Sequence, residues 1–382
     1  MAPVASCGKS TMLAALFLIW TSALAVVEAC PTQCACADTT VNCTNLQFFS
    51  LPTNIPTDTT VLDLSYNNIS ALLPDAFSTL LSLTIVDLQH NNISTVNETA
   101  FYRANSFTLS SLHTIDLSYN VLTSVPGVLH DGSLPGLLTL SLRHNKITDI
   151  PANAFFAVIN NGLLSLDLSN NLIEEVHLAA FRGTAPVING TLDLSFNRIK
   201  TFPVLSTLNS VITVNLEGNQ ITEVPEHALP NYEAFPFSVS YVYLQNNSIS
   251  RVHNNSFHPD MKVLYLHNNE LRDFPGFELW RLTELENLTL NDNPWGCCDD
   301  LLEFVLYVQN NTHRLAFIND TGFPVVECMD PLDLRGTDIL FMNTSHLAED
   351  SLCPVSTAVT FACDHLITVV CIILAILKIT EK

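Results

Sequence analysis

The chain has 382 residues, of which 48% are hydrophobic and 14% are charged, and its formal net charge is −22. Such an acidic chain is a poor partner for nucleic acid or for an anionic membrane surface, whereas a basic protein or Ca²⁺ is electrostatically easier to bind. Eleven cysteines and many Asn-x-Ser/Thr sequences indicate an oxidising, secretory compartment.

Residues 1–29 are predicted to be a signal peptide. Lys9 supplies a positive charge, Met12 to Trp20 forms an apolar core, and small residues precede Cys30. The apolar core is short for a membrane span, so a membrane anchor at this end is the less favoured alternative.

Residues 30–60 are expected to form a cap that contains four cysteines. The open end of a stacked-repeat domain exposes apolar residues and must be covered, and two disulfides can hold a small cap with little core of its own. Spacing alone allows three pairings, and a zinc site is the less favoured alternative. The cysteines are Cys30, Cys34, Cys36 and Cys43.

Residues 61–296 repeat one phrase ten times. Leu163 to Ile173 shows it, with apolar residues at the first, fourth, sixth and eleventh positions and Asn171 at the ninth. Leu166 and Leu168 lie on one side of a short strand, and the Asn171 amide can satisfy backbone groups of the turn that follows. The Asn recurs every 22 to 29 residues, at Asn67, Asn91, Asn120, Asn145, Asn171, Asn197, Asn219, Asn247, Asn269 and Asn293.

The repeats must stack, because one repeat alone cannot bury its apolar side. The predicted fold is a leucine-rich-repeat solenoid, an α/β horseshoe with a parallel concave sheet, an irregular convex side and a disulfide cap at each end. Ten strands at roughly 4.8 Å spacing give a concave face about 45–50 Å long. Phenylalanines between the strands, such as Phe77 and Phe101, are predicted to form a buried spine.

Residues 297–353 are expected to cap the other end of the solenoid. They follow the Asn-Pro-Trp sequence that closes the last repeat at Trp295, and they contain the cysteines Cys297, Cys298, Cys328 and Cys353.

The cysteine clusters and the repeats between them resemble extracellular leucine-rich-repeat proteins with cysteine caps, among them the variable lymphocyte receptors and the Nogo receptor and Slit class. The resemblance covers roughly residues 30–353. The adjacency of Cys297 and Cys298 departs from that family, which usually separates these cysteines by one residue. The resemblance implies the pairings Cys30–Cys36, Cys34–Cys43, Cys297–Cys328 and Cys298–Cys353.

Residues 354–382 are predicted to be a hydrophobic, membrane-anchoring tail. A single span from Val355 to Leu377 fits the length of a bilayer, and a glycolipid-anchor signal starting at Ser356 to Ala358 is the alternative. Asp364 counts against the span, and the charged last five residues count against the anchor signal. Either tail places the solenoid at the cell surface, on the extracellular side of the plasma membrane.

No catalytic motif is present, since Gly-x-Ser-x-Gly, P-loop and His-Glu-x-x-His sequences do not occur and the twelve histidines are scattered. The sequence therefore predicts a protein that is not an enzyme, with no catalytic residue, no cofactor and no metal site.

The concave face is the predicted binding surface. Its outward positions are acidic toward the N-terminal half and aromatic toward the C-terminal half. Exposed tyrosines are enriched among binding hot spots, although they can also pack against each other across strands. Neighbouring aspartates repel by about 1 kcal/mol in water unless a basic ligand or Ca²⁺ relieves them, but Leu-Asp-Leu-Ser is also a common wording of such repeats. The predicted ligand-binding residues are Tyr241, Tyr243, Tyr265, His267, Gln245, Asp167, Asp193 and Glu217.

Asn-x-Ser/Thr sequences predict glycosylation at several positions. Asn287 is expected on the concave strand of the last repeat, where a glycan would restrict protein ligands to the middle of the face. The predicted sites are Asn68, Asn92, Asn97, Asn189, Asn246, Asn254, Asn287, Asn310, Asn319 and Asn343.

The leading functional hypothesis is a cell-surface recognition receptor or co-receptor that binds an extracellular protein or glycan on the concave face. A signalling co-receptor is a possible further partner, because the predicted inner tail is short. The alternative is an adhesion or extracellular-matrix-organising protein without a signalling role.

Overall fold

A computed structural model gives the arrangement of most of the chain between residues 30 and 342. The predicted signal peptide and tail, together with Cys298, Cys353, Asn319 and Asn343, lie outside the described residues. The structure describes residues 30–103, 107–129, 134–156, 162–182, 188–205, 208, 211–229, 239–297, 301–311, 326–330 and 334–342.

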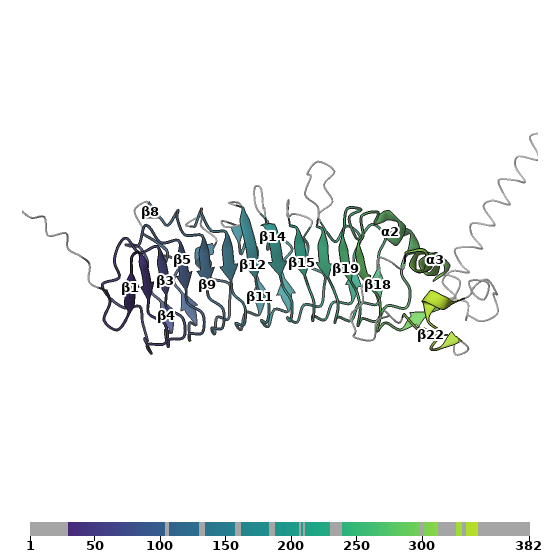
Figure 1. Cartoon of the computed structure of the whole chain (residues 1–382), viewed down its shortest axis with the longest axis horizontal. Coiled ribbons are helices and arrows are strands. Elements are labelled where there is room, and N and C mark those ends of the chain that lie inside the picture. The colour runs from purple at the N-terminus through teal and green to yellow at the C-terminus, as the bar shows by residue number, and fades with distance from the viewer. Residues whose placement is uncertain are drawn as a thin grey trace, which may run out of the picture.

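The chain winds into an elongated solenoid whose inner face is one 12-stranded sheet (Figure 1). Successive coils each supply one strand, and neighbouring strands are parallel and follow the order of the chain. These strands are β3 (Val61–Asp63), β5 (Ile85–Asp87), β9 (Thr114–Asp116), β10 (Thr139–Ser141), β12 (Leu163–Asp167), β14 (Ile188–Asp193), β15 (Thr213–Asn215), β17 (Tyr241–Tyr243), β19 (Val263–Tyr265) and β20 (Asn287–Thr289).

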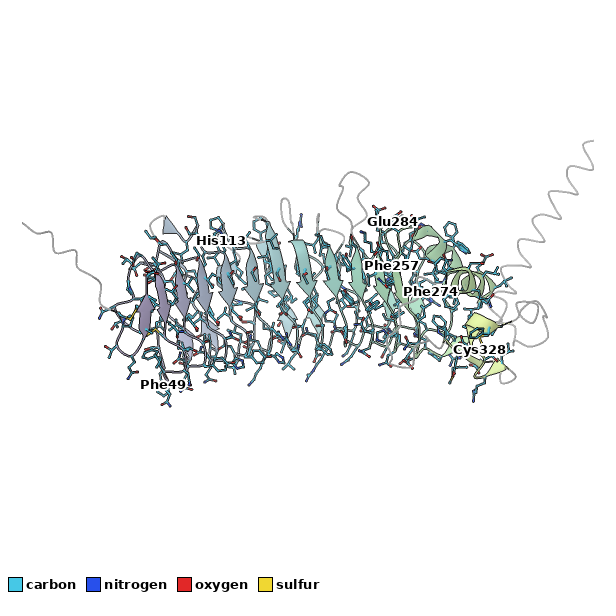
Figure 2. All side chains as sticks on the ribbon, viewed as in Figure 1. Phe49, His113, Phe257, Phe274, Glu284 and Cys328 are labelled. Carbon is cyan, nitrogen blue, oxygen red and sulfur yellow. A yellow bond between two sulfur atoms is a disulfide. The ribbon has the colours of Figure 1, made fainter. Side chains whose placement is uncertain are left out.

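The strand leucines stay in register through the sheet, as the sequence predicts. Leu62 aligns with Val86, which aligns with Ile115, and these side chains are at most 1% exposed. Phe257 and Phe274, which Figure 2 labels, are also only 2% exposed. Burial of this apolar face against the neighbouring coils is the main force that holds the stack together.

The predicted phenylalanine spine is also confirmed. Phe77 stacks on Phe101 with ring centroids 4.9 Å apart, and Phe155 stacks on Phe181 at 5.9 Å. All four rings are at most 1% exposed.

The repeated asparagine holds its own turn and also joins two coils. The Asn171 side-chain nitrogen donates to the carbonyl oxygens of Leu168, in its own coil, and Leu142, in the preceding coil, both at 3.0 Å. Its side-chain oxygen accepts the backbone N–H of Ile147 at 3.1 Å. The same arrangement recurs along the solenoid, so the predicted role in the turn is confirmed and a bond between coils is added.

The convex side is irregular, with short paired strands, turns and one short helix. The strand pairs are β4 (Ala71–Leu72) with β6 (Thr95–Val96), β7 (Tyr102–Arg103) with β8 (Phe107–Thr108), β11 (Asp149–Ile150) with β13 (Glu175–Val176), and β16 (Glu223–Val224) with β18 (Arg251–Val252). A 3₁₀ turn η1 (Gly127–Leu129) and helix α2 (Gly276–Arg281) complete this side.

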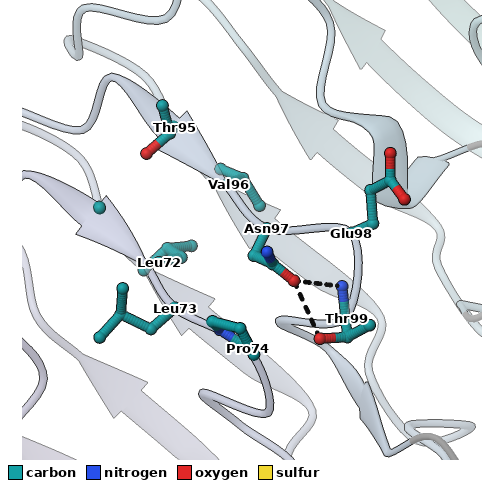
Figure 3. Close-up of a pocket in the computed structure, with 9 residues that line it drawn as sticks. Leu72, Leu73, Pro74, Thr95, Val96, Asn97, Glu98 and Thr99 are labelled. Carbon is teal, nitrogen blue, oxygen red and sulfur yellow. Dashed lines mark hydrogen bonds between the residues drawn. The ribbon is translucent and has the colours of Figure 1, made fainter.

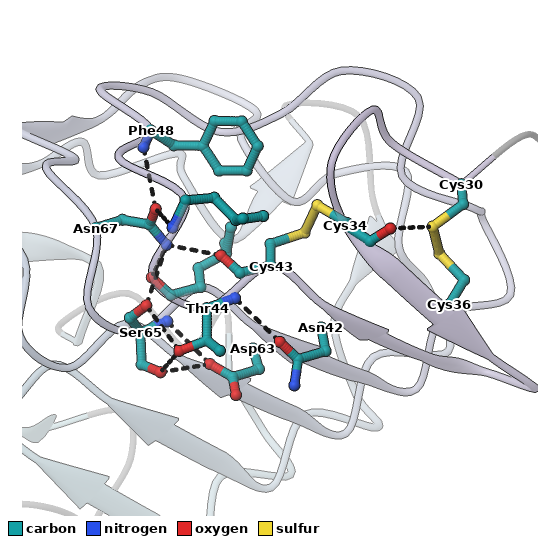
Figure 4. Close-up of a disulfide and its surroundings, with 12 residues drawn as sticks. Cys30, Cys34, Cys36, Asn42, Cys43, Thr44, Phe48, Asp63, Ser65 and Asn67 are labelled. Carbon is teal, nitrogen blue, oxygen red and sulfur yellow. Dashed lines mark hydrogen bonds between the residues drawn. A yellow bond between two sulfur atoms is a disulfide. The ribbon is translucent and has the colours of Figure 1, made fainter.

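The N-terminal cap continues the sheet. Its hairpin, β1 (Ala35–Ala37) and β2 (Thr40–Asn42), is antiparallel, and β2 then pairs with β3 in parallel. Disulfides join Cys30 to Cys36 and Cys34 to Cys43, so the pairings implied by the resemblance are confirmed (Figure 4). The Asn67 side chain donates to the Cys43 carbonyl oxygen at 2.8 Å, which ties the cap to the first repeat.

The C-terminal cap covers the other end of the core. The disulfide Cys297–Cys328 is present, as implied, and links the paired strands β21 (Trp295–Gly296) and β22 (Cys328–Asp330). Helix α3 (Leu302–Asn310) places Phe304 against the buried Trp295 ring, with centroids 4.6 Å apart. A 3₁₀ turn η5 (Ile339–Phe341) follows. Within the described part of the chain, no helix has the length and apolar character needed to cross a membrane.

Helix α2 is fixed by a buried carboxylate. Glu278 is 0% exposed and accepts the backbone N–H groups of Asn255 at 2.7 Å and Phe257 at 2.9 Å, both in the preceding coil. Arg281 donates to the same carboxylate at 2.8 Å. The helix is therefore joined to its neighbour by a paired and hydrogen-bonded charge.

Candidate functional site

The outward positions of the strands form continuous rows across the concave sheet. The middle row runs, in register, through Asp63, Asp87, Asp116, Ser141, Asp167, Asp193, Asn215, Tyr243, Tyr265 and Thr289. The acidic and aromatic halves predicted from the sequence are therefore two parts of one surface, which also carries the other predicted ligand-binding residues.

The tyrosine cluster, which consists of Tyr241, Tyr243 and Tyr265, shows the cross-strand packing that the sequence left open as one of two alternatives. The three side chains are half-buried. Tyr243 and Tyr265 pack edge to face with ring centroids 5.3 Å apart. Burial raises the pKa of Tyr243, and the neighbouring Tyr265 and Tyr241 raise it further. The cluster is thus a rigid, uncharged aromatic surface whose rings still meet solvent.

His267 extends this surface toward the last repeat. Its Nδ1 lies 2.9 Å from the Thr289 hydroxyl, and its ring lies 6.2 Å from the Tyr265 ring. Burial lowers the pKa of His267, and the opposing effect of Asp292 is smaller. A neutral imidazole at this position can donate or accept a hydrogen bond.

The aspartates of the middle row have a structural role in the turn. Asp167 and Asp193 each accept, at 2.9 Å, the backbone N–H two residues later, from Ser169 and Ser195. Asp87 accepts the backbone N–H of Gln89 in the same way at 3.0 Å. This local hydrogen bond explains why the sequence Leu-Asp-Leu-Ser recurs, because a short side chain with an acceptor stabilises the turn.

The carboxyl groups of the row also act on one another. Burial raises the pKa of Asp87, and the carboxylates of Asp116 and Asp63 raise it further. Within the part of the chain that the structure describes, no aspartate of the middle row forms an ion pair. The described residues also contain no cluster of three or more side chains suited to a metal ion.

Glu217 and Gln245 occupy neighbouring outward positions beside the tyrosines. Glu217 accepts the Asn246 side-chain N–H at 3.0 Å. Gln245, predicted to contact ligand, is only 7% exposed, and its side-chain oxygen has no hydrogen-bond partner among the described residues. Its burial could not be foreseen from the alternation of the strand.

A stack of aromatic rings along the rim was missed by the sequence analysis. Tyr66, His90, Tyr119 and His144 follow one another with ring centroids 4.3, 4.1 and 4.3 Å apart. Each has a φ between 51° and 55°, in the left-handed region that bulky residues rarely adopt. The available signal was an aromatic residue directly before the repeated asparagine in four successive repeats. Two of the histidines, His90 and His144, therefore belong to one cluster.

The predicted glycosylation sites lie on accessible positions where the structure describes their side chains. Asn68, Asn92, Asn97, Asn254 and Asn310 are exposed, and Asn246 and Asn287 are half-buried. The Asn97 side-chain oxygen accepts both the backbone N–H and the hydroxyl of Thr99 at 2.9 Å (Figure 3). It borders an open groove of about 550 Å³ that also contains Leu73 and Pro74.

A comparison with known families agrees with the coils and the repeated asparagine seen in the structure. The family described as leucine rich repeat matches residues 58–109, 110–159, 135–187 and 238–294. The chain is a leucine-rich-repeat protein. Its terminal disulfides fit the cysteine caps of that class.

Curated relatives match much of the chain at low identity. Osteomodulin from Bos taurus is 25% identical over 304 residues, which cover 76% of this chain and 59% of osteomodulin. Lumican from Gallus gallus is 28% identical over 271 residues, covering 69% of this chain and 73% of lumican. These relatives are extracellular matrix proteins, and they support an extracellular, ligand-binding leucine-rich-repeat protein.

A solved structure agrees with the fold. A chain in the octameric complex of Latrophilin 3, Unc5D and FLRT2 (LRR) aligns over 82% of this chain and 98% of its own length. The TM-score is 0.56 and the identity is 22%, so the likeness concerns the fold.

Proposed function

We propose that this leucine-rich-repeat protein is a recognition receptor or co-receptor of the cell surface, and that it binds an extracellular protein or glycan on the concave face. The observation that carries the proposal is the tyrosine cluster, which lies half-exposed on the sheet. A tyrosine offers a large rigid contact area and a hydroxyl at low entropic cost. The proposal includes no catalytic role.

Two features of the face support binding at its C-terminal half. Edge-to-face packing holds Tyr243 and Tyr265 in place before a ligand arrives, so less side-chain freedom is lost on binding. Asn287 also lies on this face, in register with Val263 and half-buried, so a glycan there would limit a protein ligand to the middle of the sheet. Peptide mass mapping that finds Asn287 unmodified would remove this limit.

The experiment compares staining by a dimeric fusion of residues 30–353 on cells and matrix of the source tissue. Replacement of Tyr241, Tyr243 and Tyr265 by Ala should weaken staining by more than about tenfold, because a hot-spot residue contributes roughly 2 kcal/mol or more. The matched control replaces exposed apolar residues away from the concave face by Ala, namely Phe49, Leu178 and Phe277, which are 75%, 68% and 68% exposed. Staining that survives the tyrosine changes, or that the control changes abolish equally, refutes the concave site.

An adhesive or matrix-organising protein is the second candidate, favoured by the similarity to osteomodulin and lumican. Cells that carry the full-length chain should aggregate with one another if adhesion is its role, and should remain single if it is a receptor for another ligand. Anchoring is tested separately with a phosphatidylinositol-specific phospholipase. Release from the cells identifies a glycolipid anchor, and retention favours a span.

A further inference from the structure

Gln245 is an unusual residue of the concave face, because its side-chain oxygen is buried without a partner. The residue is 7% exposed, and the oxygen has no hydrogen bond within the described part of the chain. Nearly all buried polar atoms in proteins are hydrogen-bonded, and an orphaned acceptor destabilises the fold. A group that donates to this oxygen would remove that penalty.

Gln245 lies between Glu217 on one neighbouring strand and His267 on the other. Glu217 holds the adjacent position on the next strand, roughly 4.8 Å away along the sheet, since the backbone N–H of Gly218 donates to the Gln245 carbonyl oxygen at 3.1 Å. One Glu217 carboxylate oxygen accepts from Asn246, and no ion pair involves Glu217 among the described residues. Asp193 adds a second carboxylate one strand further along.

No fixed positive charge of the sheet balances these groups. The outward positions from β12 to β20 contain neither Lys nor Arg. The nearest ionisable ring on the same row is His267, whose pKa is lowered by burial and which is therefore neutral near pH 7. A cationic group of a ligand would therefore be attracted to the boundary between the acidic and aromatic halves.

The aromatic ring next to Gln245 favours one kind of cation over others. Tyr243 is half-buried and is held by Tyr265. A guanidinium is planar, stacks on an aromatic ring and presents several N–H donors in one plane, whereas an ammonium is a compact, strongly hydrated charge. Arginine can therefore contact the Tyr243 ring, the Gln245 oxygen and the Glu217 carboxylate at once.

We propose that the concave face recognises an arginine side chain of a protein partner, seated between Glu217, Tyr243 and Gln245. This inference rests on the proposed function and specifies the ligand of the same face. The guanidinium donates to the Gln245 oxygen and to the free oxygen of Glu217. Because the Gln245 oxygen is closed to solvent, binding requires the Gln245 side chain to turn toward the concave face as the arginine enters.

The test uses purified full-length protein in mild detergent, immobilised through a tag inserted before Cys30. The probes are fluorescein-labelled octa-arginine and octa-lysine, which have equal charge and differ in the shape of the cation. Octa-arginine should bind about tenfold more tightly than octa-lysine, because only the guanidinium satisfies ring, amide and carboxylate together. Equal affinities overturn the proposal.

Variants of two residues separate recognition from folding. Gln245→Leu should weaken octa-arginine binding about fivefold or more while the melting temperature stays the same or rises, because an orphaned acceptor is removed. Glu217→Gln should weaken binding as well. Glu174→Gln removes an equal charge from an exposed carboxylate on the convex side and should leave binding unchanged. Unchanged binding in Gln245→Leu overturns the proposal, and so does equal loss in Glu174→Gln.

The outcome is kept distinct from that of the proposed function. In one outcome, the tyrosine changes abolish tissue staining while Gln245→Leu and an excess of octa-arginine leave it intact. That result supports binding on the concave face and refutes recognition of an arginine. If staining survives the tyrosine changes, the proposed function itself is refuted. Binding of chitotriose that is lost in Gln245→Leu would assign the site to a glycan and overturn the proposal.

Discussion

Replacement of Asn171 by Ala should show how strongly the repeated asparagine joins the coils. The side chain is 5% exposed, donates to Leu142 and Leu168 and accepts the backbone N–H of Ile147. Alanine leaves that N–H buried without an acceptor, which costs about 1–3 kcal/mol, and removes net hydrogen-bond stabilisation of about 1 kcal/mol more. We expect a loss of about 3 kcal/mol, a large part of the usual stability of a domain.

Urea unfolding of residues 30–353 measures the loss, and hydrogen exchange of the Ile147 amide shows where it arises. The control is Arg198→Ala, which breaks an exposed ion pair with Glu174 at 3.7 Å and should cost about 0–1 kcal/mol. Because repeats contact only their neighbours, faster exchange should be concentrated in the coils on either side of Asn171. A variant as stable as the control, with the Ile147 amide still protected, would refute the reasoning.

Three further changes test other parts of the solenoid. Glu278→Gln should lower the melting temperature and cost about 3–5 kcal/mol, because Arg281 loses its buried partner, whereas exposed Glu284→Gln should have little effect. Burial lowers the pKa of His267, so the unfolded chain binds a proton at this residue more readily than the folded chain. The free energy of unfolding should therefore fall as the pH drops below 6.5, the ordinary pKa of histidine. In thermal melts, His267→Gln should show a smaller fall of the melting temperature over the same pH range. Tyr119→Asn removes two ring pairs, worth about 0.5–1.5 kcal/mol each, and gains an easier left-handed backbone, worth about 1–2 kcal/mol. The unfolding free energy should therefore fall by less than about 2 kcal/mol, and a larger loss in urea unfolding would contradict this.

The sheet could be predicted residue by residue, because its pattern is set by packing that repeats. Leu166 and Leu168 must face the core in every coil, and Asn171 must satisfy a turn that recurs with them. A single period therefore determined register, strand direction and the buried side. The disulfide pairings needed the resemblance as well, since spacing alone left three alternatives for the N-terminal cap.

Features that depend on contacts between particular side chains could not be predicted in the same way. The rim stack needs the left-handed turn at Tyr66 and its three successors, which brings rings from different coils together. Gln245 lies at an outward position and was expected to be accessible, but it is buried. Nothing in the repeat pattern marks Glu278, and only the packing of α2 shows that its carboxylate binds the coil before it.

The rim stack has a mechanical consequence for the solenoid. Its rings are 4.1–4.3 Å apart, closer than the roughly 4.8 Å between neighbouring strands. The rim of the first four coils is therefore in continuous ring contact, which adds an attraction between coils to the hydrogen bonds of the sheet. Beyond His144 the corresponding position is Asn170, which interrupts the stack before the next ring at that position, Phe196. The first four coils are therefore joined along the rim as well as through the sheet.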